Sequence, residues 1–225
     1  MNSAMHQPAL LCLLALLAAA CSGPAPTDPK AVSTAALVSD EEPEARTAAR
    51  AGLRRFLDLV PERGRAEYGF SSQDELSRAQ LAEPYRVWTA DSSQLEAGAG
   101  AEALGATREW RFPVTVDGEP RALLTVAAMD GRLQAVDLGA AHLARELGQL
   151  ERARAVAPRS RRILLRIHRI RADLVAFPEA DAKIESTRFE PLASAQALPQ
   201  APRGPVEVPR LLPWLRDRVL AARHE

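Results

Sequence analysis

The sequence is poor in cysteine and histidine, the side chains that most often hold a transition metal. Its 225 residues include two cysteines, Cys12 and Cys21, and four histidines, which are scattered at positions 6, 142, 168 and 224. The chain contains neither a C-x-x-C pair nor an H-E-x-x-H motif, whereas a zinc site needs about four converging ligands. We therefore expect no metal site and no cofactor.

The motifs of nucleotide-binding and hydrolytic enzymes are absent as well. The chain has no G-x-G-x-x-G fingerprint, no G-x-x-x-x-G-K-[ST] loop and no G-x-S-x-G elbow, so no residue is indicated as catalytic. A Ser-His-acid triad is nevertheless assembled by folding and leaves no fixed spacing in a sequence. We therefore expect a non-enzymatic role and keep a hydrolase as the alternative.

An excess of charge of one sign is also missing. The chain has 29 basic and 29 acidic residues, and a neutral chain has no overall field that would draw it to nucleic acid. We therefore expect no nucleic-acid partner. Lysine is scarce, since only Lys30 and Lys183 are present, and this preference for arginine is typical of a GC-rich coding sequence.

Long apolar runs are limited to one segment near the start of the chain. Residues 9–20 form an apolar run of 12 residues, which is too short to cross a bilayer as a helix but suits the core of a secretory signal. We therefore expect residues 1–20 to be a signal peptide and the mature protein to be exported. Cys12 is lost with the signal, so the mature chain can form no internal disulfide.

The end of the apolar run carries a recognisable pattern. Ala18-Ala19-Ala20 stands directly before Cys21, and Ser22 follows it. This arrangement resembles the lipobox of bacterial lipoproteins, in which the cysteine is lipidated and becomes the first mature residue. The resemblance covers residues 9–22 alone, and Ala18 stands where the family usually has Leu, Val or Ile.

The resemblance implies a protein anchored in the cell envelope through a lipid on Cys21. Ser22, where some members have Asp, implies the outer membrane, on its periplasmic or surface side. Cleavage by the general signal peptidase after Ala20 is the alternative, and it would leave Cys21 as a free thiol.

The remaining 205 residues are enough for one medium-sized domain, and 47% of the chain is hydrophobic. We expect a disordered tether at 21–38, a domain at 39–190, a Pro-rich linker at 191–209 and a C-terminal helix at 210–225.

Apolar residues at helical spacing predict several helices. The first helix should begin with the capping box at 39–42, continue through Ala45 and Ala49, and stop at Pro61. Ser71 or Ser72 should cap a short helix that reaches Leu81. Another helix should follow Gly139, with leucines at 143, 147 and 150 facing inward.

Alternating apolar residues predict a three-stranded antiparallel meander over 107–138, with turns at 117–118 and 130–131. We prefer a three-residue first loop, which aligns Trp110 with Leu124 and Phe112 with Ala122. A two-residue loop would place Phe112 opposite Leu123. The middle strand, 122–127, is apolar on both sides, so we expect both of its faces to be covered.

Other features surround this meander. Residues 85–89 should form a strand, and the Ala/Gly/Ser-rich stretch 91–106 a mobile loop. Pro113 cannot donate to a ladder, so we expect the first strand of the meander to be an edge or to be bulged there, and an edge could accept a partner strand. Aromatic residues 85, 88, 110 and 112 are interpreted as core rather than as a ligand groove.

The arginine-rich stretch 161–171 fits either a helix or a strand, and its isoleucines favour a strand. A last strand at 183–189 would complete a hairpin. The expected fold class is therefore α+β, with an antiparallel meander, a later hairpin and flanking helices.

The same stretch is the strongest electrostatic signal in the chain. Residues 151–171 contain eight arginines and one acid, Glu151, and guanidinium groups bind phosphate and carboxylate through two hydrogen bonds. The candidate anion-binding residues are Arg161, Arg162, Arg166, Arg169 and Arg171. The alternative is a strand face whose arginines pair with acids elsewhere.

Together these patterns predict a binding or scaffolding protein of the cell envelope, partnered by the membrane and by an envelope protein or an anionic polymer. The alternatives are a hydrolase acting on envelope material and a binder of anionic glycan or lipid. No pattern in the chain indicates an oligomeric state.

Overall fold

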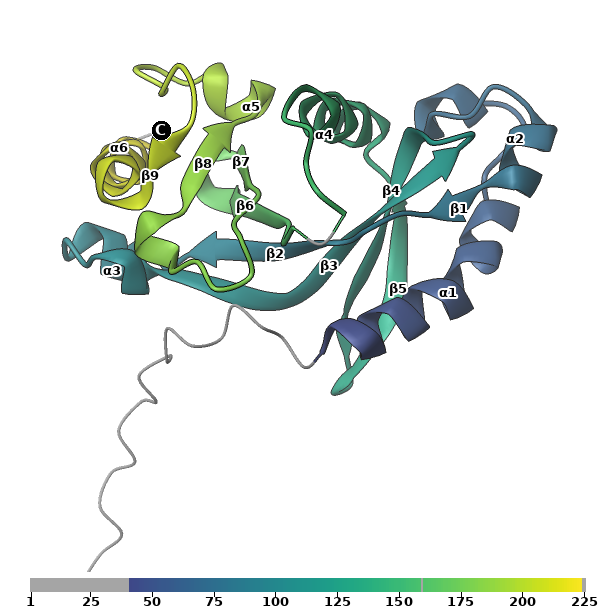
Figure 1. Cartoon of the computed structure of the whole chain (residues 1–225), viewed down its shortest axis with the longest axis horizontal. Coiled ribbons are helices and arrows are strands. Elements are labelled where there is room, and N and C mark those ends of the chain that lie inside the picture. The colour runs from purple at the N-terminus through teal and green to yellow at the C-terminus, as the bar shows by residue number, and fades with distance from the viewer. Residues whose placement is uncertain (1–40, 159, 224–225) are drawn as a thin grey trace, which may run out of the picture. The chain divides into compact units, whose positions relative to one another are not determined.

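The structure is a computed structural model that describes residues 41–158 and 160–223 (Figure 1). The expected signal peptide at 1–20, tether at 21–38 and lipidation site Cys21 lie outside the described residues, as do residues 39–40 of the expected capping box. The first described helix begins at Glu42, with Glu41 rather than Ser39 at its N-cap. Within them the chain has the expected α+β fold, in which helices flank a mostly antiparallel sheet.

The sheet has nine strands in the order β5-β4-β3-β2-β6-β7-β8-β9, and the short strand β1 also pairs with β3. Neighbouring strands are antiparallel except for β2 and β6, which are parallel, with Arg86 opposite Ile163. The strands are β1 (Gln80–Leu81), β2 (Tyr85–Ala90), β3 (Leu104–Val116), β4 (Glu119–Met129), β5 (Arg132–Gly139), β6 (Ile163–Ile167), β7 (Ala172–Ala176), β8 (Arg188–Pro191) and β9 (Val206–Glu207).

Six α-helices accompany the sheet in the described part of the chain. They are α1 (Glu42–Asp58), α2 (Gln73–Arg78), α3 (Ser92–Glu96), α4 (Ala141–Ala153), α5 (Ala193–Gln196) and α6 (Val208–Ala221). Short 3₁₀ turns lie at Arg65–Tyr68, Ala101–Ala103, His168–Ile170 and Ile184–Ser186.

We call β1, β3, β4 and β5 the meander half of the sheet. Helix α1 packs on its β4 and β5 strands, and Ala45, Ala49 and Leu57 of the helix are buried there. The approach is close at Gly52, where a Cβ in place of the glycine hydrogen would lie 2.2 Å from the Cβ of Ala135. A glycine is therefore needed for this helix to lie so near β5.

Helix α4 covers the opposite face of the sheet (Figure 1). Leu123 packs with Ala144 and Leu147 on the α4 side, whereas Leu124 belongs to the core on the α1 side. The expectation that both faces of the middle strand are covered is thus confirmed. The expected helix after Gly139 is confirmed too, although Gly139 itself ends β5.

We call β2, β6, β7, β8 and β9 the C-terminal half of the sheet. Its main core is formed with α3 and α6, and Leu211, Leu215 and Val219 of α6 are fully buried in it. The stretch 191–209, expected to be an extended linker, instead contains α5 and β9, and Leu192 and Val208 are buried. Its prolines had suggested an extended chain, but its few apolar side chains pack on the core.

The two halves are one continuous sheet joined through β2. Arg86 of β2 lies opposite Trp110 on one side and opposite Ile163 on the other. Because directly opposite residues share a face of the sheet, the α1 core and the α6 core lie on the same face. Helix α4 lies on the other face.

The expected register of the meander is wrong by two residues. Asp117 and Gly118 form a two-residue turn with φ values of 52° and 81°, as a type I′ turn requires. A bulge at Arg121 then shifts the pairing, so that Phe112 lies opposite Leu124 and Trp110 opposite Val126. A shift of two keeps each side chain on its predicted face.

Three further expectations need correction. The helix after Ser72 ends at Arg78, and residues 80–81 form β1. The stretch 91–106 contains α3, whose N-terminus is capped by Asp91, and the start of β3. The expected last strand at 183–189 is β8, which begins only at Arg188, and the hairpin is made by β6 and β7.

Pro113 does not mark an edge, because β3 has partners on both sides. Its carbonyl accepts a hydrogen bond from Ala82 at 2.8 Å, at the point where the partner of β3 changes from β1 to β2. The N–H that proline lacks therefore falls in the gap between these two strands. The sheet tolerates the residue there, and no partner strand can add beside it.

One true edge is β5, and α1 shields part of it. The backbone N–H of Leu133 donates to Glu44, and Arg55 donates to the carbonyl of Ala135 at 3.0 Å. Side chains of α1 thus form hydrogen bonds with backbone groups that an edge strand would otherwise present to solvent.

Candidate functional site

The five candidate arginines are divided among different environments. Arg162 directly precedes β6 and Arg166 lies within it, and both side chains are largely buried. Arg169 and Arg171 lie at the turn between β6 and β7 and are exposed. Arg161 is half-buried before β6. The five do not form one continuous face.

Arg162 belongs to a buried polar cluster. Its Nε donates to Glu151 at 2.6 Å, and the hydroxyl of Tyr85 donates to the same carboxylate oxygen at 2.5 Å. Burial raises the pKa of Tyr85, and the charge of Glu151 adds to this effect. The phenol therefore stays protonated and serves as a hydrogen-bond donor.

Arg166 is neutralised within its own hairpin. It donates through two nitrogens to Asp173 on β7, at 2.8 and 3.3 Å. Burial opposes the charge on Arg166, but the hydrogen bonds and the charge of Asp173 outweigh it and raise its pKa. The backbone N–H of Asp173 donates to Ser194 of α5, so α5 lies beside this pair.

Arg169 and Arg171 are the two candidates that remain available. Both are exposed, and neither forms an ion pair or a side-chain hydrogen bond with another residue in 41–158 or 160–223. They flank Ile170, which packs against the C-terminal core. The turn is therefore anchored while its two guanidinium groups face solvent.

Arg161 has an intermediate status. One of its terminal nitrogens is buried without a hydrogen-bond partner. Burial lowers its pKa, and the charge of Asp181 partly offsets the effect. A partly desolvated cation of this kind is a weaker candidate for a solvent-borne ligand than the exposed pair.

The distribution of charge along the chain gives a signal that the total charge conceals. Residues 160–223 contain 12 Arg and Lys against 7 Asp and Glu, whereas residues 41–158 contain 15 against 19. The segment 160–223, which contains β6 to β9 and α6, is thus basic although the whole chain is neutral. A comparison of the two segments would have found this asymmetry from the sequence.

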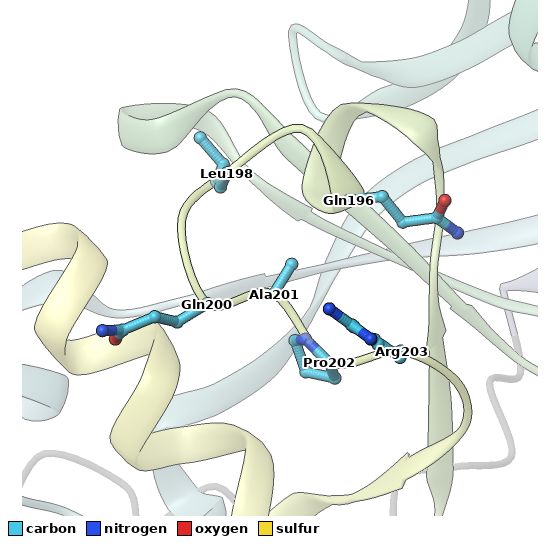
Figure 2. A pocket seen from close by; sticks show the side chains of 6 residues that line it. All are labelled: Gln196, Leu198, Gln200, Ala201, Pro202 and Arg203. Carbon is cyan, nitrogen blue, oxygen red and sulfur yellow. The ribbon is translucent and has the colours of Figure 1, made fainter.

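The loop between α5 and β9 forms an open pocket (Figure 2). Its volume is about 450 Å³, which lies in the range of small-molecule sites. The lining residues are Gln196, Leu198, Gln200, Ala201, Pro202 and Arg203. The prolines of this stretch predicted a linker, so the pocket was not expected from the sequence.

The histidines do not form a catalytic arrangement. His142 on α4 and His168 in the β6–β7 turn are exposed, and within the described residues neither makes a side-chain hydrogen bond to a carboxylate or a hydroxyl. No group of three or more His, Cys, Asp or Glu side chains in this part of the chain is arranged to hold a metal ion. Likewise, none of the helices in residues 41–158 and 160–223 is long and apolar enough to cross a membrane.

The aromatic side chains lie in the core, as interpreted from the sequence. Tyr85, Trp88, Trp110 and Phe112 are all less than 8% exposed. Arg86 lies over the ring of Trp110, 5.2 Å from its centre. None of these four residues lines the pocket at 196–203.

Comparisons of the chain with protein-family models, with curated proteins and with solved structures found no match.

Proposed function

We propose that this protein is a lipid-anchored lipoprotein of the cell envelope, with a non-enzymatic binding or scaffolding role. The observation that carries the proposal is the apolar run at 9–20, which ends in three alanines directly before Cys21. This is the order of features expected of an exported chain whose cysteine receives the lipid.

The rest of the chain is compatible with such an anchor. Cys12 and Cys21 are the only cysteines, so the folded domain has no thiol that could compete with Cys21 for modification. Within the described residues, the first helix starts at Glu42, twenty-one residues beyond Cys21. Several acyl chains at about 0.8 kcal/mol per buried methylene would hold the domain permanently at a membrane.

Lipidation is tested by growing the native cells with labelled palmitate and comparing Cys21→Ser with the matched control Cys12→Ser. We expect label and detergent-phase partitioning in the natural protein and in the control, and neither in Cys21→Ser. An unmodified Cys21 thiol in the intact mass of the mature protein, or label that survives in Cys21→Ser, would contradict the anchor.

A binding role is favoured over catalysis by the kinds of groups that the domain exposes. Arg169, Arg171 and Arg203 are exposed and have no carboxylate partner among the described residues. Within the described residues, no histidine side chain forms a hydrogen bond with a carboxylate or a hydroxyl. Free guanidinium groups suit recognition of an anion, and they do not supply a nucleophile or a base near neutral pH.

A second candidate function is binding of an anionic glycan or lipid head group through the β6–β7 turn. Arg169 and Arg171 carry it, because Arg162 and Arg166 are committed to Glu151 and Asp173. Attraction between exposed charges weakens with ionic strength. Salt-dependent binding is therefore its signature.

This candidate is tested with labelled dextran sulfate and the double variant Arg169→Ala/Arg171→Ala in non-ionic detergent. We expect affinity roughly thirtyfold lower than that of the natural protein, since each of the two arginines is worth about 1 kcal/mol near an anionic surface. The control Arg50→Ala/Arg145→Ala removes the same charge from exposed sites on α1 and α4. An equal loss of affinity in both double variants, or an affinity that does not change with ionic strength, would show that the β6–β7 turn is not the binding site.

A further inference from the structure

We propose that the pocket between α5 and β9 binds a small organic anion, through a carboxylate or a phosphate held by Arg203. The proposal goes beyond the envelope role and does not depend on the lipid anchor. It rests on four observations of the loop at 196–203, which concern its rigidity, its backbone, its volume and its charge.

The loop is held in place at several points. The indole nitrogen of Trp214 on α6 donates to the carbonyl of Pro199 at 3.2 Å, and the amide of Gln196 donates to the carbonyl of Pro191 at 2.7 Å. Leu198 and Ala201 pack against the C-terminal core. A pocket whose walls are fixed before a ligand arrives needs little ordering on binding.

The backbone at the pocket is unusual. Gln200 has a φ of 56°, in the left-handed region that residues other than glycine adopt infrequently. Such a conformation is retained only where the surrounding contacts enforce it, and it is enriched at ligand sites. Pro199 precedes this residue, and Pro202 follows it by two positions, which further restricts the loop.

The walls of the pocket combine apolar and polar groups. Leu198, Ala201 and Pro202 provide apolar surface, and the polar lining residues are Gln196, Gln200 and Arg203. Figure 2 shows the Arg203 side chain directed back toward the middle of the loop. A volume of about 450 Å³ is large enough for a small organic molecule.

The charge of the pocket decides the class of ligand. Arg203 is the only charged residue that lines it, and within the described residues its guanidinium has no hydrogen bond or ion pair. A cation would be repelled there, and a neutral ligand would leave the donors of Arg203 unused. A carboxylate or a phosphate accepts two of these donors at once.

The test is calorimetric titration of the full-length protein in non-ionic detergent. The probes are N-acetyl-Ala-Ala, which has a free carboxylate, its C-terminal amide, and phenyl phosphate. We expect saturable binding of the carboxylate or the phosphate probe with a Kd of roughly millimolar or tighter, and no binding of the amide. The better of the two anionic probes identifies the kind of oxyanion.

Variants separate the pocket from general electrostatics. Arg203→Ala should weaken binding at least tenfold, roughly the value of a charge-assisted hydrogen-bond pair, and Arg210→Ala should leave it unchanged. Arg210 is a suitable control because it is exposed, lacks an ion pair among the described residues and does not line the pocket. Ala201→Leu, which fills the pocket and keeps Arg203, should also abolish binding.

The proposal is overturned if neither anion binds at roughly 10 mM, if the amide binds as well as the acid, or if Arg203→Ala binds like the natural protein. Cys21→Ser should bind the probe normally. Loss of lipidation and loss of pocket binding are therefore distinguishable results.

Discussion

Tyr85, Glu151 and Arg162 connect three elements through one carboxylate. Tyr85 begins β2, Glu151 lies near the end of α4, and Arg162 directly precedes β6. The Arg162 side chain is only 6% exposed, so its charge depends on Glu151 for compensation. A buried cation that loses its partner destabilises a fold far more than a surface pair contributes to it.

Removal of the Tyr85 hydroxyl tests the hydrogen bond between Tyr85 and Glu151, the weaker of the two interactions in this cluster. Tyr85→Phe leaves the Glu151–Arg162 pair intact and should lower the free energy of unfolding by about 1 to 2 kcal/mol in urea titration. Glu151→Gln, which leaves Arg162 without a counter-charge, should cost more, about 3 kcal/mol.

The control is Tyr68→Phe, because the Tyr68 hydroxyl makes no hydrogen bond with any other described residue and the ring is half-buried. We expect it to change stability by less than about 0.5 kcal/mol. If Glu151→Gln were as mild as Tyr68→Phe, the cluster would not compensate Arg162.

At this scale the sequence could identify residue types and not their partners. The run at 161–171 contains the five candidate arginines, but Glu151 and Asp173 reach Arg162 and Arg166 only after α4 and β7 are in place. Arg203 was overlooked because four prolines around it suggested a linker. Pairing of charges is a tertiary property and leaves no local pattern.

At the scale of elements, the contact between α1 and β5 depends on Gly52. A Cβ at this position would lie 2.2 Å from the Cβ of Ala135, and the Cα of Ala135 lies 3.6 Å away. These two nearest atoms belong to a strand and not to the end of a flexible side chain. The helix as a whole would have to move.

Gly52→Ala should therefore destabilise the protein by about 1 kcal/mol, because overpacking costs about 2 kcal/mol and the helix propensity gained by alanine returns about 1 kcal/mol. Thermal unfolding followed by circular dichroism measures the change. The control is Gly139→Ala in β5, where an added Cβ meets nothing within 4 Å. A Gly52→Ala variant as stable as the natural protein would show that α1 does not pack closely at this point.

The meander shows which aspects of an element can be predicted. Alternation of Trp110, Phe112 and Val114 assigned each side chain to its face correctly, because this period depends only on strand geometry. The pairing was off by two because the Asp117-Gly118 turn is shorter than expected and a bulge at Arg121 adds one residue. A bulge has no reliable signature in a single sequence.

At the scale of the whole molecule, two cores share one sheet. Trp110 belongs to the α1 core, whereas Trp88 and Trp214 belong to the α6 core. The parallel pair β2–β6 and helix α4 join the halves. A sheet that crosses from one core to the other should make their unfolding cooperative.

The three tryptophans, the only ones in the chain, allow this to be measured. Trp110→Phe leaves fluorescence from the α6 core, and Trp88→Phe/Trp214→Phe leaves fluorescence from the α1 core. We expect the two signals and the circular dichroism of each variant to report one urea transition. Midpoints that differ between probes within one variant would mean that the halves unfold separately.

The fold class and most elements could be predicted because periodicity and turn residues are local. The extent of the domain could not, since the stretch around α5 and β9 is buried only by contacts with α6 and β8, exemplified by Trp214 with Pro199 and Arg188 opposite Glu207.

The hydrogen bonds from β5 to Glu44 and from Arg55 to β5 acquire a particular meaning under the proposed lipid anchor, which would tether the molecules to one surface. Neighbours confined to two dimensions collide often, and an open strand edge would let one copy seed a fibre along the membrane. With α1 seated there, copies held at a membrane by the proposed anchor would stay separate, and the proposed anion site in the C-terminal half would remain accessible.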